Sequence, residues 1–252
     1  MLLAVDIGNS NITIGLFSQK RFLSFRISTN LKSTQDEYSI MIYNLFNIHS
    51  IKDKVDGAII SSVVPQVSEK IKSAITKLFN IKVLEVSPGI KTGMPIKYDN
   101  PKEVGADRIV NAVGAYEEFK SALIIIDSGT AITFDVINKN GEYIGGAIAP
   151  GINISADALA YKTAKLPRVE LKPPQHVIGK NTIDSIQSGL VFGHISMIEG
   201  MIKRIQDEMG CKCINIATGG EGAIFYRHIK EIDAYRPHLT LLGLKIIYER
   251  NK

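Results

Sequence analysis

Two segments about half the chain apart share one pattern of apolar and polar positions. Residues 2–13 read LLAVDIGNSNIT, and residues 123–134 read LIIIDSGTAITF. In each copy an apolar run leads to an aspartate, one further residue and a glycine, and a second apolar segment follows. This pattern predicts a buried strand, a tight turn and a second strand. Because the copies are offset by nearly half of the 252 residues, we expect two related domains, residues 1–118 and 119–252.

The first half continues with alternating strand and helix patterns. Thr34 and Glu37 have capping-box spacing and predict the start of a helix that runs to about Ile48. Apolar residues at every fourth position predict a second helix over residues 67–79. Strands are predicted at residues 22–27, 57–64 and 81–86. The order of the first half, βββαβαβ, is an α/β arrangement.

The second half repeats this plan with more helix. Residues 88–100 read as a loop, and Pro101 predicts the start of a helix, capped by Asn100, that runs to about Phe119. Asn140 and Gly141 predict a hairpin between strands at 133–137 and 142–149. A further strand is predicted at 212–217, and further helices are predicted at 155–165, 181–209, 221–230 and 239–250.

Composition places the chain among ordinary folded proteins. Hydrophobic residues make up 45% and charged residues 22%, which excludes disordered, collagen-like and coiled-coil classes. No stretch free of Asp, Glu, Lys and Arg exceeds 14 residues, so we expect no membrane span, and the first residues lack the pattern of a signal peptide. We therefore expect a cytoplasmic protein.

The net charge of +5 is spread along the chain. Such a surface is compatible with nucleic-acid binding, but no nucleic-acid-binding motif accompanies the charge, so anionic small molecules are the favoured ligands.

The two turns are the first candidates for chemistry. Asp6 offers a carboxylate to a hydrated Mg²⁺, and the following turn offers backbone N–H groups to phosphate oxygens. A single turn of this kind is an ordinary end of a strand. Its repetition at Asp127 favours a pair of turns that bind the phosphates of a nucleotide.

Two further motifs have both a structural and a functional interpretation. Thr218, Gly219 and Gly220 follow a predicted strand and offer N–H groups to a nucleotide, although glycine there also permits close packing. Asp107 and Arg108 lie side by side on a predicted helix, which is typical of a solvated face. Their apolar neighbours favour a cleft instead, where Arg108 would bind a carboxylate and Asp107 would accept a proton.

The ordered set of motifs resembles the type III pantothenate kinases of the acetate and sugar kinase, heat-shock chaperone and actin superfamily. The resemblance covers the whole chain and rests on six segments: DIGNSNITIG from residue 6, YDNPKEVGADR from 98, DSGTAITFD from 127, GGAIAPG from 145, GKNT from 179 and TGG from 218. It implies two ribonuclease H-like domains of the actin-like ATPase superfamily, each a mixed sheet flanked by helices. It also implies ATP-dependent phosphorylation of pantothenate, the first step of coenzyme A biosynthesis.

The resemblance also implies roles for individual residues. Asp107 would be the proton acceptor, Asp127 would hold a monovalent cation, K⁺ or NH₄⁺, and Asp6 would hold Mg²⁺ through water. The remaining implied contacts are with ATP, from Asp6, Ile7, Gly8, Asn9, Ser10, Asn11, Ile12, Thr13 and Thr130, and with pantothenate, from Tyr98, Gly105, Ala106, Asp107, Arg108 and Thr182. The family works as a homodimer in which the partner completes the substrate site.

Two other functions remain open at this point. Another small-molecule kinase of the superfamily would share both turns, but it has no reason to contain the sequence GADR at residues 105–108. A non-enzymatic nucleotide-binding protein, either regulatory or actin-like, would bind ATP without phosphorylating an acceptor.

Overall fold

The structure is a computed structural model that describes residues 1–19 and 21–252. The chain divides into two compact units, one made of residues 1–118 and 238–252 and the other of residues 119–237. The first limit coincides with the expected domain boundary after residue 118. The expected second domain, however, includes a C-terminal helix that packs in the first unit.

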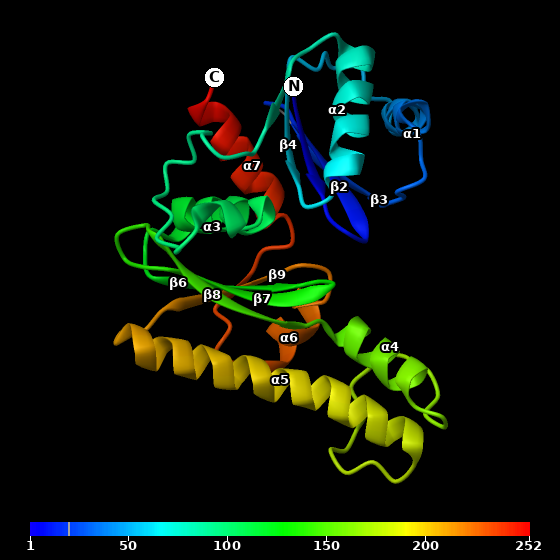
Figure 1. Cartoon of the computed structure of the whole chain (residues 1–252), viewed down its shortest axis with the longest axis vertical. Helices are drawn as coiled ribbons and strands as arrows, with labels where there is room; N and C mark the ends of the chain where they lie inside the picture. Colours follow the sequence, from blue (N-terminus) through cyan, green and yellow to red (C-terminus); the bar gives the residue numbers. More distant parts are fainter. Residues whose placement is uncertain (20) are drawn as a thin grey trace. The chain divides into compact units, whose positions relative to one another are not determined.

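The first unit contains a five-stranded mixed sheet (Figure 1). Its strand order is β3-β2-β1-β4-β5, in which β1, β2 and β3 are antiparallel neighbours and β4 and β5 continue parallel to β1. The strands are β1 (Leu2–Ile7), β2 (Asn11–Phe17), β3 (Phe22–Ser28), β4 (Gly57–Ser62) and β5 (Val83–Glu85). The order along the chain, βββαβαβ, is confirmed.

Helices cover both faces of this sheet (Figure 1). Helices α1 (Gln35–Ile48) and α2 (Pro65–Phe79) enclose a core with alternate residues of β1 and β4, including Val5 and Ile60. Helix α7 (Leu239–Arg250) packs on the other face, where a Cβ atom on Gly15 would lie 2.9 Å from Leu241. The residues of β1 and β4 that alternate with this core, Asp6 and Ser61 among them, therefore belong to the α7 face.

Helix α3 (Ala106–Phe119) packs closely against α7 in the first unit. A Cβ atom on Gly114 would lie 3.0 Å from the carbonyl oxygen of Leu239, and one on Gly243 would lie 2.0 Å from that of Val110. Glycine at both positions lets the two helix backbones approach. The C-terminal helix is therefore a built-in part of the first unit.

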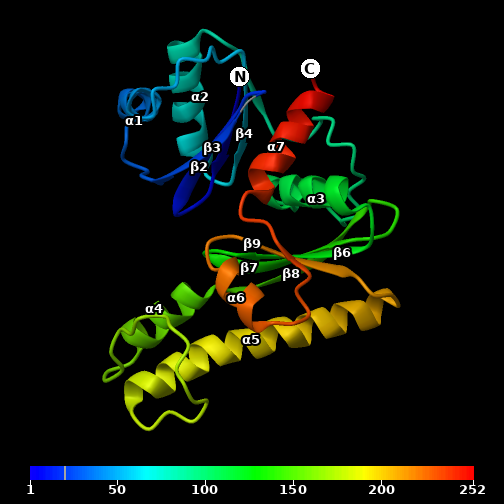
Figure 2. The same ribbon diagram turned by 180° about the vertical axis from the view of Figure 1, so that it is seen from behind.

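The second unit repeats the first sheet in strand order. The order β10-β9-β6-β7-β8 has antiparallel neighbours β6, β7 and β8, with β9 and β10 continuing parallel to β6. The strands are β6 (Leu123–Ser128), β7 (Ala131–Ile137), β8 (Tyr143–Pro150), β9 (Ile214–Thr218) and β10 (Ala234–Tyr235). The helices are α4 (Ile152–Lys162), α5 (Thr182–Met209) and α6 (Gly222–His228). Figure 2 shows α5 running along one face of this sheet.

Local signals set the ends of several elements as predicted. The backbone N–H of Glu37 donates to the Thr34 hydroxyl at 3.3 Å, and that of Thr34 donates to the Glu37 carboxylate at 2.6 Å, so the capping box is confirmed. Gly141 has a φ of 79° in the hairpin between β7 and β8, a conformation that glycine adopts without strain.

Two predicted helix starts are wrong. Pro101–Glu103 forms only a short 3₁₀ turn, because Val104 is extended, and α3 begins after Gly105. Helix α4 begins at Ile152, three residues before the predicted start, because Gly151 is its N-cap. Strand β10, two residues long, was not predicted.

No helix in the described part of the chain is long and apolar enough to cross a membrane.

Candidate active site

The first unit carries the first D-x-G turn at the end of a hairpin. Asp6 pairs with Thr13 across β1 and β2, and the backbone N–H of Gly8 donates to the carbonyl oxygen of Asn11 at 3.0 Å. The side chains of Asn9, Ser10 and Asn11 are exposed, whereas those of Ile7 and Ile12 are fully buried in the core. The two isoleucines can therefore contribute only backbone groups to a nucleotide site.

The residue after β3 braces this turn. The Thr29 hydroxyl donates to the carbonyl oxygen of Gly8 at 2.7 Å, and the Thr29 backbone N–H donates to that of Ser10 at 3.0 Å. Both bonds use carbonyl groups of the turn and none of its N–H groups.

Asp6 has an unusual electrostatic environment. Burial raises the pKa of this half-buried carboxyl to about 7, against the lowering effect of a hydrogen bond from Ser61, and the charge of Asp107 raises it further. A carboxylate held in such a place favours a bound cation. One carboxylate together with substrate phosphates and water is a usual donor set for Mg²⁺, so Asp6 fits the ion that the sequence predicts there.

Asp107 lies in the first turn of α3. Its Oδ1 atom accepts a hydrogen bond from the Arg108 backbone N–H at 2.8 Å and lies only 2.5 Å from the place that a Cβ atom on Gly105 would occupy. The carboxylate is thus folded back over Gly105. Burial raises the pKa of Asp107, and the hydrogen bond and positive charge of Arg108 lower it.

Arg108 does not lie on a solvated helix face. Only 9% of its surface is exposed, and Asp107 is half-buried, so that interpretation of the pair is wrong. Tyr98, in the loop before the 3₁₀ turn, is also half-buried. The first unit therefore contains Asp6, the D-x-G turn that follows it and the Asp107–Arg108 pair.

Two glycine-containing segments of the second unit pack on the second D-x-G turn. Gly219 has a φ of 85°, and a Cβ atom there would lie 2.3 Å from the carbonyl oxygen of Ser128 and 2.4 Å from Oδ1 of Asp127. A Cβ atom on Gly151 would lie 2.5 Å from the carbonyl oxygen of Thr130. Gly219 therefore packs against Asp127, and Gly151 packs against the backbone of Thr130, whose side chain is exposed.

The TGG segment has a clear structural role. The Thr218 hydroxyl donates to the carbonyl oxygen of Arg236 at 2.7 Å, and the Glu221 backbone N–H donates to that of Ser128 at 3.2 Å. These bonds tie the segment to β6 and to the residues after β10. Close packing thus requires glycine here, and the contact with Asp127 also puts the segment beside the second turn.

Thr182 lies elsewhere in the second unit. It is exposed and lines a cavity of about 700 Å³ between α4 and α5, with Leu159 and Leu166. Leu159 is in the last turns of α4, whereas Gly151, which packs on the second turn, precedes this helix. Most of α4, roughly 1.5 Å per residue, therefore separates Thr182 from the turn of its own unit.

Three comparisons with known proteins bear on this geometry. Residues 2–204 match the family model described as type III pantothenate kinase. The chain belongs to the type III pantothenate kinase family. It is 51% identical over 257 residues to the type III pantothenate kinase of Syntrophobacter fumaroxidans, with 100% of this chain and 99% of the relative covered.

Solved structures with low sequence identity share the fold. Component A of the Acidaminococcus fermentans (R)-2-hydroxyglutaryl-CoA dehydratase aligns with a TM-score of 0.57 at 14% identity, over 100% of this chain and 99% of that one. An inorganic polyphosphate/ATP-glucomannokinase from Arthrobacter aligns with a TM-score of 0.52 at 14% identity, over 99% and 98%. The predicted fold class, two mixed sheets flanked by helices as in actin-like ATPases and sugar kinases, is confirmed. Family membership makes this protein an enzyme, a kinase, so a non-enzymatic function is not favoured.

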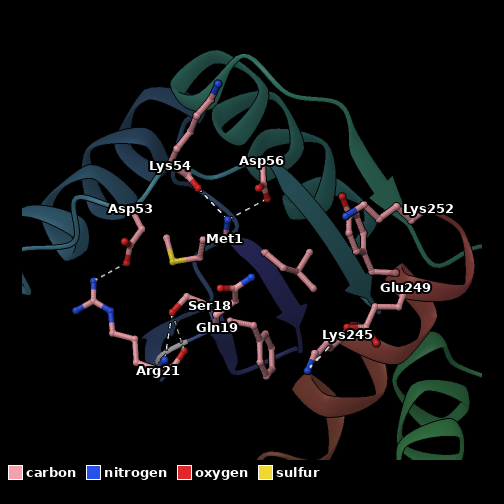
Figure 3. Close-up of a pocket in the computed structure, with 13 residues that line it drawn as sticks. Met1, Ser18, Gln19, Arg21, Asp53, Lys54, Asp56, Lys245, Glu249 and Lys252 are labelled. Atoms are coloured by element: carbon pink, nitrogen blue, oxygen red, sulfur yellow. Dashed lines mark hydrogen bonds and ion pairs between the residues drawn. The ribbon is translucent and has the colours of Figure 1, made fainter.

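Another cavity, of about 940 Å³, lies at the opposite end of the β1–β2 hairpin from the D-x-G turn (Figure 3). Leu2 and Phe17, which pair across the hairpin, line it. Ion pairs within it join Arg21 to Asp53 and the Met1 amino group to Asp56, each at 3.0 Å (Figure 3). It contains none of the predicted site residues, and sequence analysis did not identify it.

Ser61 is a site residue that sequence analysis missed. Its hydroxyl donates a 2.5 Å hydrogen bond to Oδ1 of Asp6. Two serines at the end of the otherwise apolar strand GAIISS were the available signal.

Proposed function

We propose that this protein transfers the γ-phosphoryl group of ATP to the primary hydroxyl of pantothenate, the first step of coenzyme A biosynthesis, with Asp107 as proton acceptor. Membership of the family supports the reaction. The observation that carries the role of Asp107 is its place in the unit of the phosphate-binding turn, where its charge acts on Asp6.

Phosphoryl transfer requires the protein mainly to position the two substrates and to neutralise charge on the phosphates. The hydroxyl oxygen of pantothenate bonds to the γ-phosphorus, the bond from that phosphorus to the bridging oxygen of ADP breaks, and the hydroxyl proton passes to Asp107. Burial raises the pKa of Asp107 and makes its carboxylate a better proton acceptor. Arg108 is proposed to hold the pantothenate carboxylate with two parallel hydrogen bonds, and Tyr98, Gly105, Ala106 and Thr182 to complete the pantothenate site.

ATP is proposed to bind through residues of both D-x-G turns. The first unit supplies residues 6–13, with side chains from Asp6, Asn9, Ser10, Asn11 and Thr13 and backbone groups from Ile7, Gly8 and Ile12, and the second unit supplies Thr130. Asp6 would hold Mg²⁺ through water, and bound Mg²⁺ neutralises charge on the phosphate oxygens. Asp127, which lies beside Gly219, is proposed to hold K⁺ or NH₄⁺.

A coupled assay for ADP tests this function. We expect ADP release with MgATP to require pantothenate. ADP release at the same rate with and without pantothenate, or only with a sugar or another hydroxy acid, would contradict the proposed substrate. The proposal includes a cytoplasmic location, which the free thiols of Cys211 and Cys213 support.

The proposal includes a homodimer in which Thr182 acts in the site of the partner copy. Helix α4 separates Thr182 from the second turn of its own chain, and apolar side chains near it are exposed, Ile178 to 81% and Tyr161 to 77%. A monomer rarely leaves so many large apolar groups in water. The others in this unit are Ile148, Ile154, Val177, Ile183 and Tyr226.

Mixed dimers test the shared site. Asp107→Asn and Thr182→Ala homodimers should each be weakly active, but a re-equilibrated mixture contains dimers with one intact site. We expect the mixture to recover about one quarter of the wild-type rate, because half of the dimers are mixed and half of their sites are intact. No recovery, with exchange of subunits verified by sedimentation of tagged chains, would mean that Thr182 acts in its own chain.

A further inference from the structure

Ser61 and Asp6 are held opposite each other by the parallel pairing of β1 and β4. The register aligns Asp6 with Ser61, and both side chains lie on the face that α7 covers. The Ser61 side chain is fully buried, in a strand whose other residues are Gly, Ala, Ile and a second Ser. A buried hydroxyl costs stability unless it is hydrogen-bonded, so its partner at this position matters.

That partner is the Asp6 carboxylate. The Ser61 Oγ atom donates to Oδ1 at 2.5 Å, and among the described residues it is the side chain that hydrogen-bonds to this carboxylate. A free carboxylate rotates broadly about its terminal torsion. Tethering one oxygen to a strand fixes this rotation and presents Oδ2 for other ligands.

Resting on the proposed function, we propose that Ser61 is a positioning residue that orients Asp6 toward the hydrated Mg²⁺ of MgATP. The hydroxyl acts through Asp6 and touches neither substrate. Pre-organised ligands bind a metal more tightly because their orientation is already set, and neighbours that hydrogen-bond to a ligand usually supply that orientation. Ser61→Ala removes one atom from a buried site and leaves the strand pairing in place.

Calorimetric binding of a non-hydrolysable ATP analogue, with an imide between its β- and γ-phosphorus atoms, gives a readout that does not need turnover. We expect Ser61→Ala to weaken binding of the Mg²⁺ complex by about tenfold, the loss expected for one hydrogen bond to a charged group, and to leave binding of the metal-free analogue in EDTA unchanged. Equal weakening with and without Mg²⁺, or no weakening, would overturn the proposal.

Ser68→Ala is the matched control. Ser68 is also a buried serine of the first unit, and its hydroxyl donates at 3.0 Å to the carboxylate of Glu85. Its loss should cost similar stability without changing the Mg²⁺-dependent part of binding. A change in that part equal to that of Ser61→Ala would indicate a general loosening of the unit and would overturn the specific role of Ser61.

A double-mutant cycle with Asp6→Asn completes the test. If Ser61 acts through the Asp6 carboxylate, Ser61→Ala should have no further effect on Mg²⁺-dependent binding in the Asp6→Asn background. Additive losses would overturn the proposal. These measurements contain no pantothenate, so absence of pantothenate-dependent ADP release from the wild type would count against the proposed function alone.

Discussion

Asp107, in the first turn of α3, acts electrostatically on Asp6, at the end of β1, and raises the pKa of that carboxyl. The two residues are a hundred positions apart in the sequence, yet they belong to one compact unit. Burial is the main reason that each of these carboxyls has a raised pKa, and repulsion by the Asp107 charge adds to the rise for Asp6. The two carboxyls have different proposed roles: Asp6 holds a cation, and Asp107 accepts a proton.

Asp107→Asn should lower kcat by about 10²–10⁴, because the amide cannot accept the hydroxyl proton. The variant is almost isosteric, so ATP binding should be retained. Turnover by coupled assay and nucleotide binding by calorimetry check this. The control is Asp36→Asn, which also removes a carboxylate from the first turn of a helix but at an exposed position. A folded Asp107→Asn enzyme with full activity would rule out Asp107 as the base.

Gly105→Ala should reduce activity far more than stability. The added methyl carbon would lie 2.5 Å from Oδ1 of Asp107, and that atom is at the end of a side chain that can rotate away. The chain should fold with a displaced carboxylate and lose roughly tenfold to a hundredfold in kcat, as misplaced catalytic groups do. Gly193→Ala, where a methyl group would meet none of the described residues within 4 Å, should leave kcat unchanged. Similar rates for the two variants would show that Asp107 needs no space over Gly105.

Asp6→Asn should make the protein more stable at pH 8. The pKa of Asp6 rises from 3.8 to about 7 on folding, so the folded state binds this proton more tightly than the unfolded state does. The contribution of Asp6 to the free energy of unfolding is therefore fully present below pH 3.8 and is lost as the pH rises through 7. The amide carries no charge to bury, so the gain should be on the order of a few kcal/mol at pH 8 and should shrink toward pH 4. Thermal melts of the ligand-free protein at pH 4, 6 and 8 measure it. A stability gain over wild type that is smaller at pH 8 than at pH 4 would contradict this environment for Asp6.

Asp127→Asn should make the enzyme respond less to an added monovalent cation. We expect low activity in sodium or Tris buffer with MgATP, and recovery when K⁺ or NH₄⁺ is added. In the variant this recovery should be blunted and the KM for ATP raised. Asp157→Asn, which removes a partly exposed carboxylate of the same unit that pairs with Arg168, is the control and should respond to K⁺ as the wild type does. Equal rates in sodium and potassium for wild type and variant would make Asp127 a structural turn residue.

Local patterns predicted most of this fold. The duplicated D-x-G turns, the capping box at Thr34 and the glycine turn at Gly141 depend on residues within a few positions of one another. The start of α3 was predicted too early because Pro101 is typical of the first position of a helix. Val104 is extended and ends the short 3₁₀ turn after Pro101, and no short-range pattern in the sequence indicates this.

The site depended on contacts that no local pattern contains. The hydrogen bond from Ser61 to Asp6 follows from the pairing of β1 with β4, across 55 residues. The space that Asp107 needs above Gly105 follows from a side-chain conformation. Sequence motifs indicated which residues carry chemistry, whereas tertiary structure determined which groups orient them.

The return of α7 to the first unit affects how the chain is assembled during synthesis. Residues 119–237 form a continuous unit, whereas the first unit needs residues 238–252 to cover the second face of its sheet. The ribosome therefore synthesises every residue of the inserted unit, 119–237, before it synthesises α7, the last helix of the first unit. Domains usually fold from the N-terminus onward during translation, but here the order is reversed: the inserted unit is complete first, and the unit holding Asp6 and Asp107 closes last.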